Sequence, residues 1–470
     1  MLTLADVLEA LTGNRPAQTG PVIPETAIDS RQVIPGGMFV ALPGERVDGH
    51  DYVKTAFERG AAFALVQREV AGGFRSVRLE SDRLPEIPAG EGPLCLRVEN
   101  SLTALQQTAR FWRSQLDVKV IGITGSVGKS TSKETIAEVL GQRYRTLKSP
   151  GNMNNEIGLP LSILKLGKGY ERAVLEMGFY VPGEIAFLCA IASPAIGVVT
   201  NVGTVHAERA GSQEAIFRGK SELVQSLPAD GVAVLNLDDA WVCKMAEKSP
   251  ARVFFYGLDP SADLWADEVQ GEGLEGIRFR LHSGHEVLHV HVPMIGKHSV
   301  HTALRAAAVG LVDGLSWDEI LEGLRQGHTQ LRLTAVRSEQ GALLLDDTYN
   351  ASPESMLAAL NLLAELEGRR VAILGDMLEL GQYEKQGHEI VGMRAAAVAD
   401  ALVTVGLRGH LIAEAARRAG LKARQVKEFE DTDQAIPHLR KILGSKDVVL
   451  VKGSHGVHME RIVTALEVQA

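Results

Sequence analysis

The sequence predicts an α/β protein of three domains. Two series of continuous apolar runs alternate with amphipathic stretches, one in the middle of the chain and one in its last third. This alternation is typical of parallel sheets with helices on both faces. A series of shorter strands and turns precedes them, and 470 residues exceed one ordinary core. We expect a small N-terminal α/β domain at 1–98, a central P-loop ATPase-type parallel sheet at 99–330, and a C-terminal Rossmann-like α/β domain at 331–470.

Composition narrows the class of protein. A net charge of −9 disfavours a general nucleic-acid binder, which needs an excess of Lys and Arg to displace counterions from phosphates. No apolar run approaches the ~20 residues of a membrane helix, so we expect no membrane insertion. The first residues carry no basic stretch followed by an apolar segment, so a cytoplasmic protein is expected. Cys95, Cys189 and Cys243 are far apart and are expected to be core residues rather than disulfide or zinc ligands.

The first 116 residues contain short strands and one strong helix signal. Residues 27–42 suggest strands and turns, with the turn sequences PGG at 35–37 and PGE at 43–45. A loose stretch rich in Pro, Gly and Glu follows at 81–93. Apolar residues at helical spacing then predict an amphipathic helix over 101–116.

Eight apolar runs are expected to be the strands of the two larger sheets. In the middle of the chain they lie at 118–124, 173–178, 195–203 and 232–239, and in the last third at 342–347, 371–376, 401–406 and 447–454. Each run ends in a polar or glycine-containing turn. Because ligands of open α/β sheets gather at the carboxyl ends of parallel strands, these turns are the expected binding edges.

The strongest local signal is GITGSVGKSTSKETIAEVL at 122–140. A buried strand leads into a glycine loop and then a helix, the context in which backbone N–H groups and a helix N-terminus bind phosphate. The spacing G-x-x-G-K-S is two residues shorter than that of the common P-loop. Lys129 is expected to meet the β and γ phosphates, and Ser130 to hold Mg²⁺. The expected ATP-binding residues of this segment are Thr124, Gly125, Ser126, Val127, Gly128, Lys129, Ser130 and Thr131.

Further polar side chains follow neighbouring strands. Glu176 and His206 end two strands of the middle series, and Lys220 lies in a predicted helix over 213–227. Together with the phosphate loop they could complete a Mg²⁺ or substrate site. The alternative interpretations are that Glu176 is a solvated loop residue, that His206 has a structural role, and that Lys220 faces the solvent. Asp346 and Asp347 precede Ser352, which with Pro353 also makes a good helix start.

The segment HEVLH at 285–289 matches a zinc-protease pattern. The surrounding sequence instead predicts a β-hairpin, with His285, His289 and His291 on one face. Residues four apart in a strand are roughly 13 Å apart, too far for one zinc ion. A metalloprotease is therefore not expected.

Taken together, these motifs resemble those of the Mur ligases, over essentially the whole chain. The resemblance begins with DSRQVIPGGMFVAL at 29–42 and runs through TGSVGKS, GNMNNEIGLP, LEMG and TNVGTVH. It continues through GKHSVHTALRAAA at 296–308, DDTYNASPESM, ILGDMLELG and LVKGSHG. The DDTYNASPESM block is the most discriminating part. The chain is most similar to the members of the family that join D-alanyl-D-alanine to UDP-N-acetylmuramoyl-tripeptide. These members use ATP and Mg²⁺, and their reaction passes through an acyl phosphate.

The resemblance implies roles for particular residues. The first domain would hold the uridine nucleotide, with Ser30 and Arg31 near it. The central domain would be the ATPase, with Lys129, Glu176, His206 and Lys220 as catalytic residues. Ser130, Glu176 and His206 would be the metal ligands, and Lys220 is the lysine that the family often carries as a carbamate. Asn152, Asn154 and Asn155 would line the substrate site, and Asp347 and Asn350 would face ATP. A monomer is expected.

Two departures affect what can be carried over. Ser299 and Thr302 stand where the family often has asparagines near the adenine, and His455 stands where an arginine is common.

The need to exclude water from an acyl phosphate also predicts that the third domain moves on a hinge at 327–333.

Three alternatives remain at this stage. The first is another ligase of the same mechanism, such as a folate polyglutamate ligase or a different Mur ligase. The second is a P-loop regulatory switch, and the third is an inactive structural homologue. Substrate panels and nucleotide-dependent partner binding would distinguish them.

Overall fold

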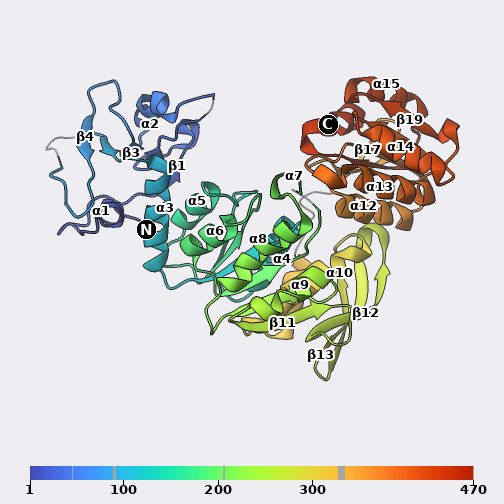
Figure 1. Cartoon of the computed structure of the whole chain (residues 1–470), viewed down its shortest axis with the longest axis horizontal. Coiled ribbons are helices and arrows are strands. Elements are labelled where there is room, and N and C mark those ends of the chain that lie inside the picture. The colour runs from blue at the N-terminus through green and yellow to red at the C-terminus, as the bar shows by residue number, and fades with distance from the viewer. Residues whose placement is uncertain (45, 88–91, 205–206, 327–333, 469–470) are drawn as a thin grey trace.

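The protein was analysed as a computed structural model, which describes residues 1–44, 46–87, 92–204, 207–326 and 334–468. Figure 1 shows three lobes in sequence order, each built around its own sheet. The α/β class and the three-domain organisation are confirmed. None of the helices in these ranges is long and apolar enough to cross a membrane.

The N-terminal sheet has five parallel strands in the order β1-β2-β3-β5-β4. They are β1 (Thr26–Ala27), β2 (Met38–Val40), β3 (Phe63–Val66), β4 (Arg75–Arg78) and β5 (Leu94–Arg97). Helices α1 (Leu4–Thr12) and α2 (Val53–Glu58) accompany them. The predicted amphipathic helix is α3 (Ser101–Ser114), capped by Asn100. It packs on α1 and on two helices of the central lobe, so one apolar core runs through both lobes.

The central sheet has nine strands in the order β14-β13-β12-β11-β10-β9-β6-β8-β7. The parallel part comprises β6 (Lys119–Thr124), β7 (Thr146–Lys148), β8 (Arg172–Glu176), β9 (Ile196–Val199), β10 (Val232–Asn236) and β11 (Arg252–Gly257). An antiparallel extension follows with β12 (Leu264–Gly271), β13 (Ile277–Ser283) and β14 (Glu286–Val292). The hairpin prediction is confirmed, because HEVLH lies in the turn and in β14, and its histidines are exposed.

Helices cover both faces of the parallel part. Val120 of β6 faces a core shared with α5 (Gly158–Leu164), α6 (Glu184–Ala192) and α8 (Gln213–Gln225). Ile121 and Ile123 face the opposite core, with α4 (Lys129–Gly141), α10 (Val300–Val312) and α11 (Trp317–Gln326). The short helices α7 (Ala207–Ala210) and α9 (Ala240–Cys243) complete this lobe. Since β6 lies between β8 and β9, the chain reverses its direction across the sheet there, which is where α/β sheets form a ligand crevice.

The C-terminal sheet has the order β15-β16-β20-β17-β18-β19, antiparallel only at β15. Its strands are β15 (Thr334–Arg337), β16 (Leu343–Asp347), β17 (Arg369–Gly375), β18 (Ala401–Val405), β19 (Val426–Phe429) and β20 (Asp447–Lys452). One face packs on α12 (Pro353–Glu365), α13 (Glu384–Val398) and α14 (Gly409–Arg418). The other packs on α15 (Thr432–Ile442) and α16 (Glu460–Leu466).

Every apolar run named from the sequence in the two larger lobes forms a strand. Cys95 and Cys189 are buried and Cys243 is half-buried, all as free thiols. The predicted hinge at 327–333 lies outside the described residues. The domain limits near 98 and 330 stay predictions.

Candidate active site

The phosphate loop follows β6 and ends at the first turn of α4. Gly128 precedes the helix with a φ of 84°, in the left-handed region. At Gly125 the φ is 145°, and a Cβ there would lie 1.8 Å from Oγ1 of Thr200. Glycine is required at Gly125 by both conformation and space. The first N–H groups of α4 have no partner within the helix and are available to phosphate oxygens.

Asn201 and Thr200 hold the loop from the end of β9. The amide oxygen of Asn201 accepts the N–H groups of Ser126 and Val127 at 3.1 and 2.9 Å. Thr200 donates its hydroxyl to the Val127 carbonyl at 2.7 Å. Neither residue was singled out from the sequence, although both lie in the TNVG segment. The loop is thereby fixed in shape before any ligand binds.

Glu176 is a buried carboxylate facing the loop. Its side chain is 1% exposed. Oε2 accepts the Ser130 hydroxyl at 2.7 Å and Oε1 accepts the Asn154 amide at 2.9 Å. Lys133, one helical turn after Lys129, places its Nζ 4.0 Å from Oε2. The sequence signal for Lys133 was its i, i+4 spacing from Lys129, which puts both on one side of α4.

Lys129 and Lys220 lie beside this group. Nζ of Lys129 donates to the Gly125 carbonyl at 2.8 Å. Lys220 is 1% exposed, and its Nζ lies 5.0 Å from the centre of the Phe179 ring. Burial lowers the pKa of the Lys220 amine well below its ordinary value, and the charge of Lys129 lowers this pKa further. The solvent-facing alternative for Lys220 is therefore wrong.

A buried guanidinium supports the loop from behind. Arg305 of α10 donates to the hydroxyl of Tyr256 at 2.7 Å and to the hydroxyl of Ser132. Ser132 in turn donates to the Gly128 carbonyl at 2.5 Å. The sequence carried no signal for this network, because its members come from distant segments.

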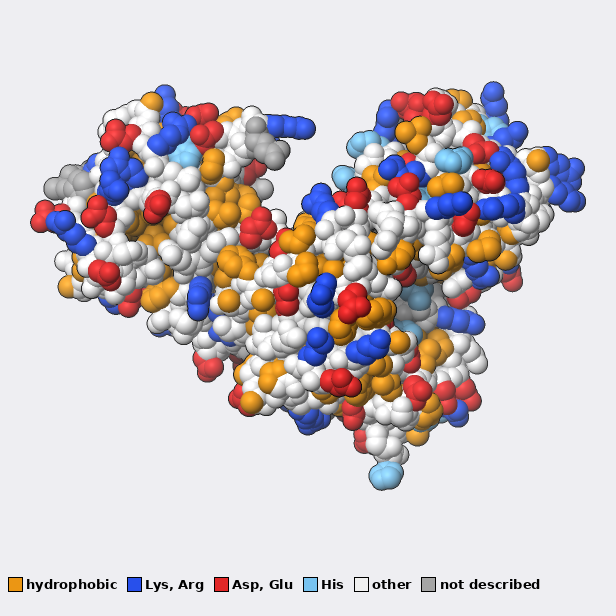
Figure 2. All heavy atoms as spheres, viewed as in Figure 1, with side chains coloured by type: hydrophobic (Ala, Val, Ile, Leu, Met, Phe, Trp, Pro, Cys, Tyr) orange, Lys and Arg blue, Asp and Glu red, His pale blue; other side chains and the backbone are white. Residues whose placement is uncertain are grey.

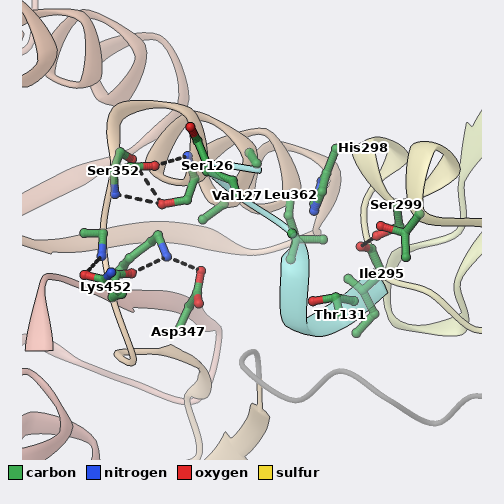
Figure 3. Close-up of a pocket in the computed structure, with 17 residues that line it drawn as sticks. Ser126, Val127, Thr131, Ile295, His298, Ser299, Asp347, Ser352, Leu362 and Lys452 are labelled. Carbon is green, nitrogen blue, oxygen red and sulfur yellow. Dashed lines mark hydrogen bonds and ion pairs between the residues drawn. The ribbon is translucent and has the colours of Figure 1, made fainter. Parts of the chain in front are cut away.

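The third lobe faces the loop across a cavity of about 210 Å³. Figure 3 shows Ser126, Val127 and Thr131 of the loop side opposite Asp347, Ser352 and Lys452 of the C-terminal lobe. Nζ of Lys452 pairs with Asp347 at 2.7 Å and donates to the Asn350 carbonyl at 2.9 Å. The departures Ser299 and Thr302 both line this cavity, as does Asn350.

Other predicted residues lie elsewhere. Thr124 is buried and donates to the Met177 carbonyl at 3.1 Å, so its hydroxyl is used within the fold. Asn155 accepts the Gly158 N–H at 2.8 Å at the start of α5, and Asn152 is exposed. Ser30 is buried, and Arg31 pairs with Asp29 at 2.7 Å, which lowers the pKa of that carboxyl to about 2. Ser30 and Arg31 lie in the first lobe, apart from the phosphate loop. His206 lies outside the described residues.

A glycine phosphate loop at the switch point of a parallel sheet, faced by a buried carboxylate and by a second α/β lobe, defines a nucleotide-binding enzyme of several domains. Comparison with known proteins specifies the family. The models "Mur ligase family, catalytic domain", "Mur ligase middle domain" and "Mur ligase, glutamate ligase domain" match residues 23–113, 123–310 and 331–455. The chain belongs to the Mur ligase family and is an ATP-dependent ligase that forms ADP.

Similar proteins cover the whole chain. A UDP-N-acetylmuramoyl-tripeptide--D-alanyl-D-alanine ligase of Bacillus subtilis is 35% identical, over 99% of this chain and 98% of its own length. One of Escherichia coli is 34% identical, over 93% and 92%.

Solved structures agree. MurF from Acinetobacter baumannii has a TM-score of 0.83 and 30% identity, with 98% and 97% of the two chains covered. A second structure from that organism, with a TM-score of 0.80 and the same identity and coverage, is named for a substrate ending in 2,6-diaminopimelate. MurF from Thermotoga maritima in complex with ADP has a TM-score of 0.78 and 29% identity, with 94% and 96% covered.

Proposed function

We propose that this chain joins D-alanyl-D-alanine to UDP-N-acetylmuramoyl-tripeptide, in the synthesis of peptidoglycan precursors. The geometry that carries the proposal is the meeting of the phosphate loop and the Asp347–Lys452 pair around one cavity, with the buried Glu176 bonded to the loop through Ser130. The full-length similarity to ligases of that name supports the choice of substrates. A folate polyglutamate ligase is less favoured, since a solved one from Mycobacterium tuberculosis has 15% identity, over 77% of this chain.

The reaction requires activation of a carboxylate. An oxygen of the tripeptide carboxylate attacks the γ-phosphorus of ATP, ADP leaves, and an acyl phosphate forms. The dipeptide amine then attacks the acyl carbon, loses a proton, and phosphate leaves as the amide forms. Phosphoryl transfer asks the protein mainly for alignment and charge neutralisation. Lys129 and the N–H groups at the start of α4 would supply both, and their position in the phosphate loop supports this.

The residues around Ser130 suit Mg²⁺. This ion prefers oxygen ligands and is usually held by one or two carboxylates together with substrate phosphates. The hydroxyl of Ser130 and the carboxylate of Glu176 are 2.7 Å apart at the loop. When bound there, Mg²⁺ would neutralise charge on the phosphate oxygens. His206 is proposed as a further ligand, from the family resemblance.

Lys220 is proposed to carry a carbamate. A carbamate forms when a neutral amine adds to carbon dioxide and loses a proton. The lowered pKa of Lys220, caused by burial and by the charge of Lys129, favours the neutral amine more than in an exposed lysine, which supports this reaction. The product is an anion that can support Mg²⁺ or a bound cationic group.

The nucleotide sugar is proposed to bind the first lobe near Ser30 and Arg31, with its peptide reaching Asn154 and Asn155. We also propose a monomer working in the cytoplasm, where ATP and nucleotide sugars are supplied. Ser299 and Thr302 place hydroxyl groups in the cavity wall, where the family often has the side-chain amides of asparagines. These hydroxyl groups would contact the nucleotide base.

The test measures phosphate release and product mass with ATP, Mg²⁺, the UDP-muramoyl tripeptide and D-alanyl-D-alanine, omitting each in turn. The expected product is heavier than the tripeptide by one dehydrated dipeptide and forms only when all are present. ATP hydrolysis without that product would assign the chain to another acceptor. Nucleotide binding without any turnover would favour a regulatory role.

A further inference from the structure

A second cavity, of about 240 Å³, opens beside the catalytic carboxylate. It lies between the segment before α5 and the segment joining β8 to α6. Its lining residues are Asn154, Asn155, Glu156, Gly178, Tyr180, Pro182, Gly183, Glu184, Phe187 and Leu188. The phosphate-loop residues line a different cavity, so this one is available to another part of the substrates.

Asn154 connects this cavity to the reacting centre. Its amide nitrogen donates to Glu176 Oε1 at 2.9 Å, and Glu176 accepts the Ser130 hydroxyl. Its amide oxygen lies 2.9 Å from where a Cβ of Gly178 would be, so it forms part of the wall. A substrate carboxylate held near Ser130 for phosphoryl transfer would therefore lie about the length of one side chain from this cavity.

The chemistry of the wall is apolar with a negative rim. Tyr180 and Phe187 are 41% and 42% exposed, and Leu188 and Pro182 extend the apolar surface. Glu156 and Glu184 are the charged residues of the lining, and both are acidic. Arg209 stacks on the Tyr180 ring at 4.6 Å, which leaves Phe187 as the more open aromatic face.

The carboxylates of Glu184 and Glu156 differ in their contacts within the protein. Glu184 accepts the N–H groups of Tyr180 and Val181 at 2.6 and 3.1 Å, so it shapes the cavity wall. Glu156 is exposed, and no ion pair to it exists within the described ranges of the chain. Its carboxylate is therefore the one placed to meet a charged ligand.

We propose that this cavity binds the side chain of the last residue of the tripeptide and recognises its terminal ammonium group through Glu156. The inference rests on the proposed function, in which the carboxylate of that last residue is the one activated. Its side chain branches from the atom next to that carboxylate. Five bonds of about 1.5 Å carry an ammonium about 6 Å from the Cα, with an aliphatic stem that suits the apolar wall.

The incoming dipeptide fits this cavity poorly. It presents a carboxylate at its far end, whereas the charged residues of the lining are acidic, and Arg209 on the Tyr180 ring lies 3.8 Å from the carboxylate of Glu379. Lysine, in contrast, ends in an ammonium, which a carboxylate and an aromatic face attract, and diaminopimelate carries the same ammonium on a carbon that also bears a carboxylate. Glu156 is thus assigned as a specificity-determining residue that recognises the side-chain ammonium, the group that these two diamino acids share.

The test compares kcat/KM for D-alanyl-D-alanine addition to three nucleotide tripeptides that end in lysine, Nε-acetyl-lysine or norleucine. The wild-type protein is expected to prefer lysine over norleucine by about 10-fold or more. In Glu156→Gln, that preference should fall to about 2-fold, while the norleucine rate stays unchanged. Glu275→Gln, an exposed carboxylate far along the chain, is the matched control and should retain the wild-type ratio.

Equal rates with lysine and norleucine in the wild-type protein would overturn the inference. So would a Glu156→Gln variant that keeps the wild-type ratio. Phe187→Leu provides a second measurement and should lower kcat/KM for lysine and norleucine together, since it reduces the shared apolar wall. Absence of dipeptide addition to these three tripeptides and to the one that ends in diaminopimelate would instead contradict the proposed function, so the two failures are distinguishable.

Discussion

At the scale of single residues, the active site depends on charged groups held out of water. Glu176 and Lys133 are almost fully buried and 4.0 Å apart, so each partly compensates the other. Charged groups of this kind are costly to bury unless they are paired and hydrogen-bonded. Removing one charge without changing its shape is therefore the sharpest way to test its role.

For Glu176→Gln we expect kcat to fall by about 100-fold and the Mg²⁺ concentration at half-maximal rate to rise. Glutamine keeps an acceptor for the Ser130 hydroxyl but loses the negative charge that attracts the ion. Titration of phosphate release with Mg²⁺ measures both effects. Glu138→Gln in α4, whose carboxylate pairs with Lys148, is the control. An unaltered Mg²⁺ dependence would exclude Glu176 from the metal site.

For Lys220→Met we expect loss of ligation together with a gain of about 1 to 3 kcal/mol in the free energy of unfolding. The buried amine of the wild-type protein stays neutral below its ordinary pKa of 10.5, while the unfolded chain takes up a proton. Stability of the wild-type protein is therefore lost as pH falls from 10.5 toward the lower pKa of the folded state.

The measurement is urea unfolding of both proteins between pH 7 and pH 10 in buffer depleted of carbon dioxide. The difference between them should shrink as pH rises, because the unfolded lysine then also becomes neutral. A difference that does not change with pH would mean that the buried amine keeps its proton.

At the scale of elements, strand ends and helix starts position the site. The segment after β8 lies against α8 because Gly219 has no side chain. A Cβ at Gly219 would lie 1.9 Å from Cε2 of Phe179. The same ring covers Nζ of Lys220 at 5.0 Å, so this contact also sets the surroundings of the amine.

Gly219→Ala is expected to destabilise the protein by about 1 to 3 kcal/mol, since it overpacks a filled space. Adding Phe179→Leu should recover part of the loss by shortening the ring that clashes. Gly167→Ala is the control, because a Cβ at Gly167 meets no atom within 4 Å. Urea unfolding of the single and double variants measures the coupling. Equal stability of Gly219→Ala and Gly167→Ala would contradict the packing argument.

At the scale of the whole molecule, the central and C-terminal lobes meet beside the phosphate loop, through apolar packing at Ile295 and through polar contacts. Glu354 of α12 accepts the Thr204 N–H at 3.3 Å, and Arg209 of α7 lies 3.8 Å from Glu379. Figure 2 shows an open hollow between the first and third lobes, above the central one. Relative motion of domains is the default expectation unless the interface between them is large and hydrophobic.

We expect the radius of gyration to decrease when an ATP analogue and the nucleotide tripeptide bind together. Closure excludes water from an acyl phosphate that would otherwise hydrolyse. Small-angle X-ray scattering, with each ligand alone as the control, measures the change. Identical scattering curves with and without both ligands would contradict closure of the third lobe.

Much of the fold could be predicted from the sequence because its signals are local. The runs that form β6, β8, β16 and β20 are continuously apolar, which predicts strands buried on both faces, and each ends in a polar turn. The exposed histidines of β14 also followed from alternation within one short segment. The phosphate loop could be placed for the same reason, since strand, glycines and helix are contiguous.

The burial of Glu176 and Lys220, the support given by Asn201 and Arg305, and the approach of Asp347 to the loop were decided only by tertiary structure. Each depends on which segments become neighbours, and neither periodicity nor local spacing reports that. The sequence by itself determined the elements, the phosphate loop and the family. The tertiary structure decided which charged groups lose their water, because burial depends on neighbours that are distant in the sequence, and it thereby lowered the pKa of the Lys220 amine.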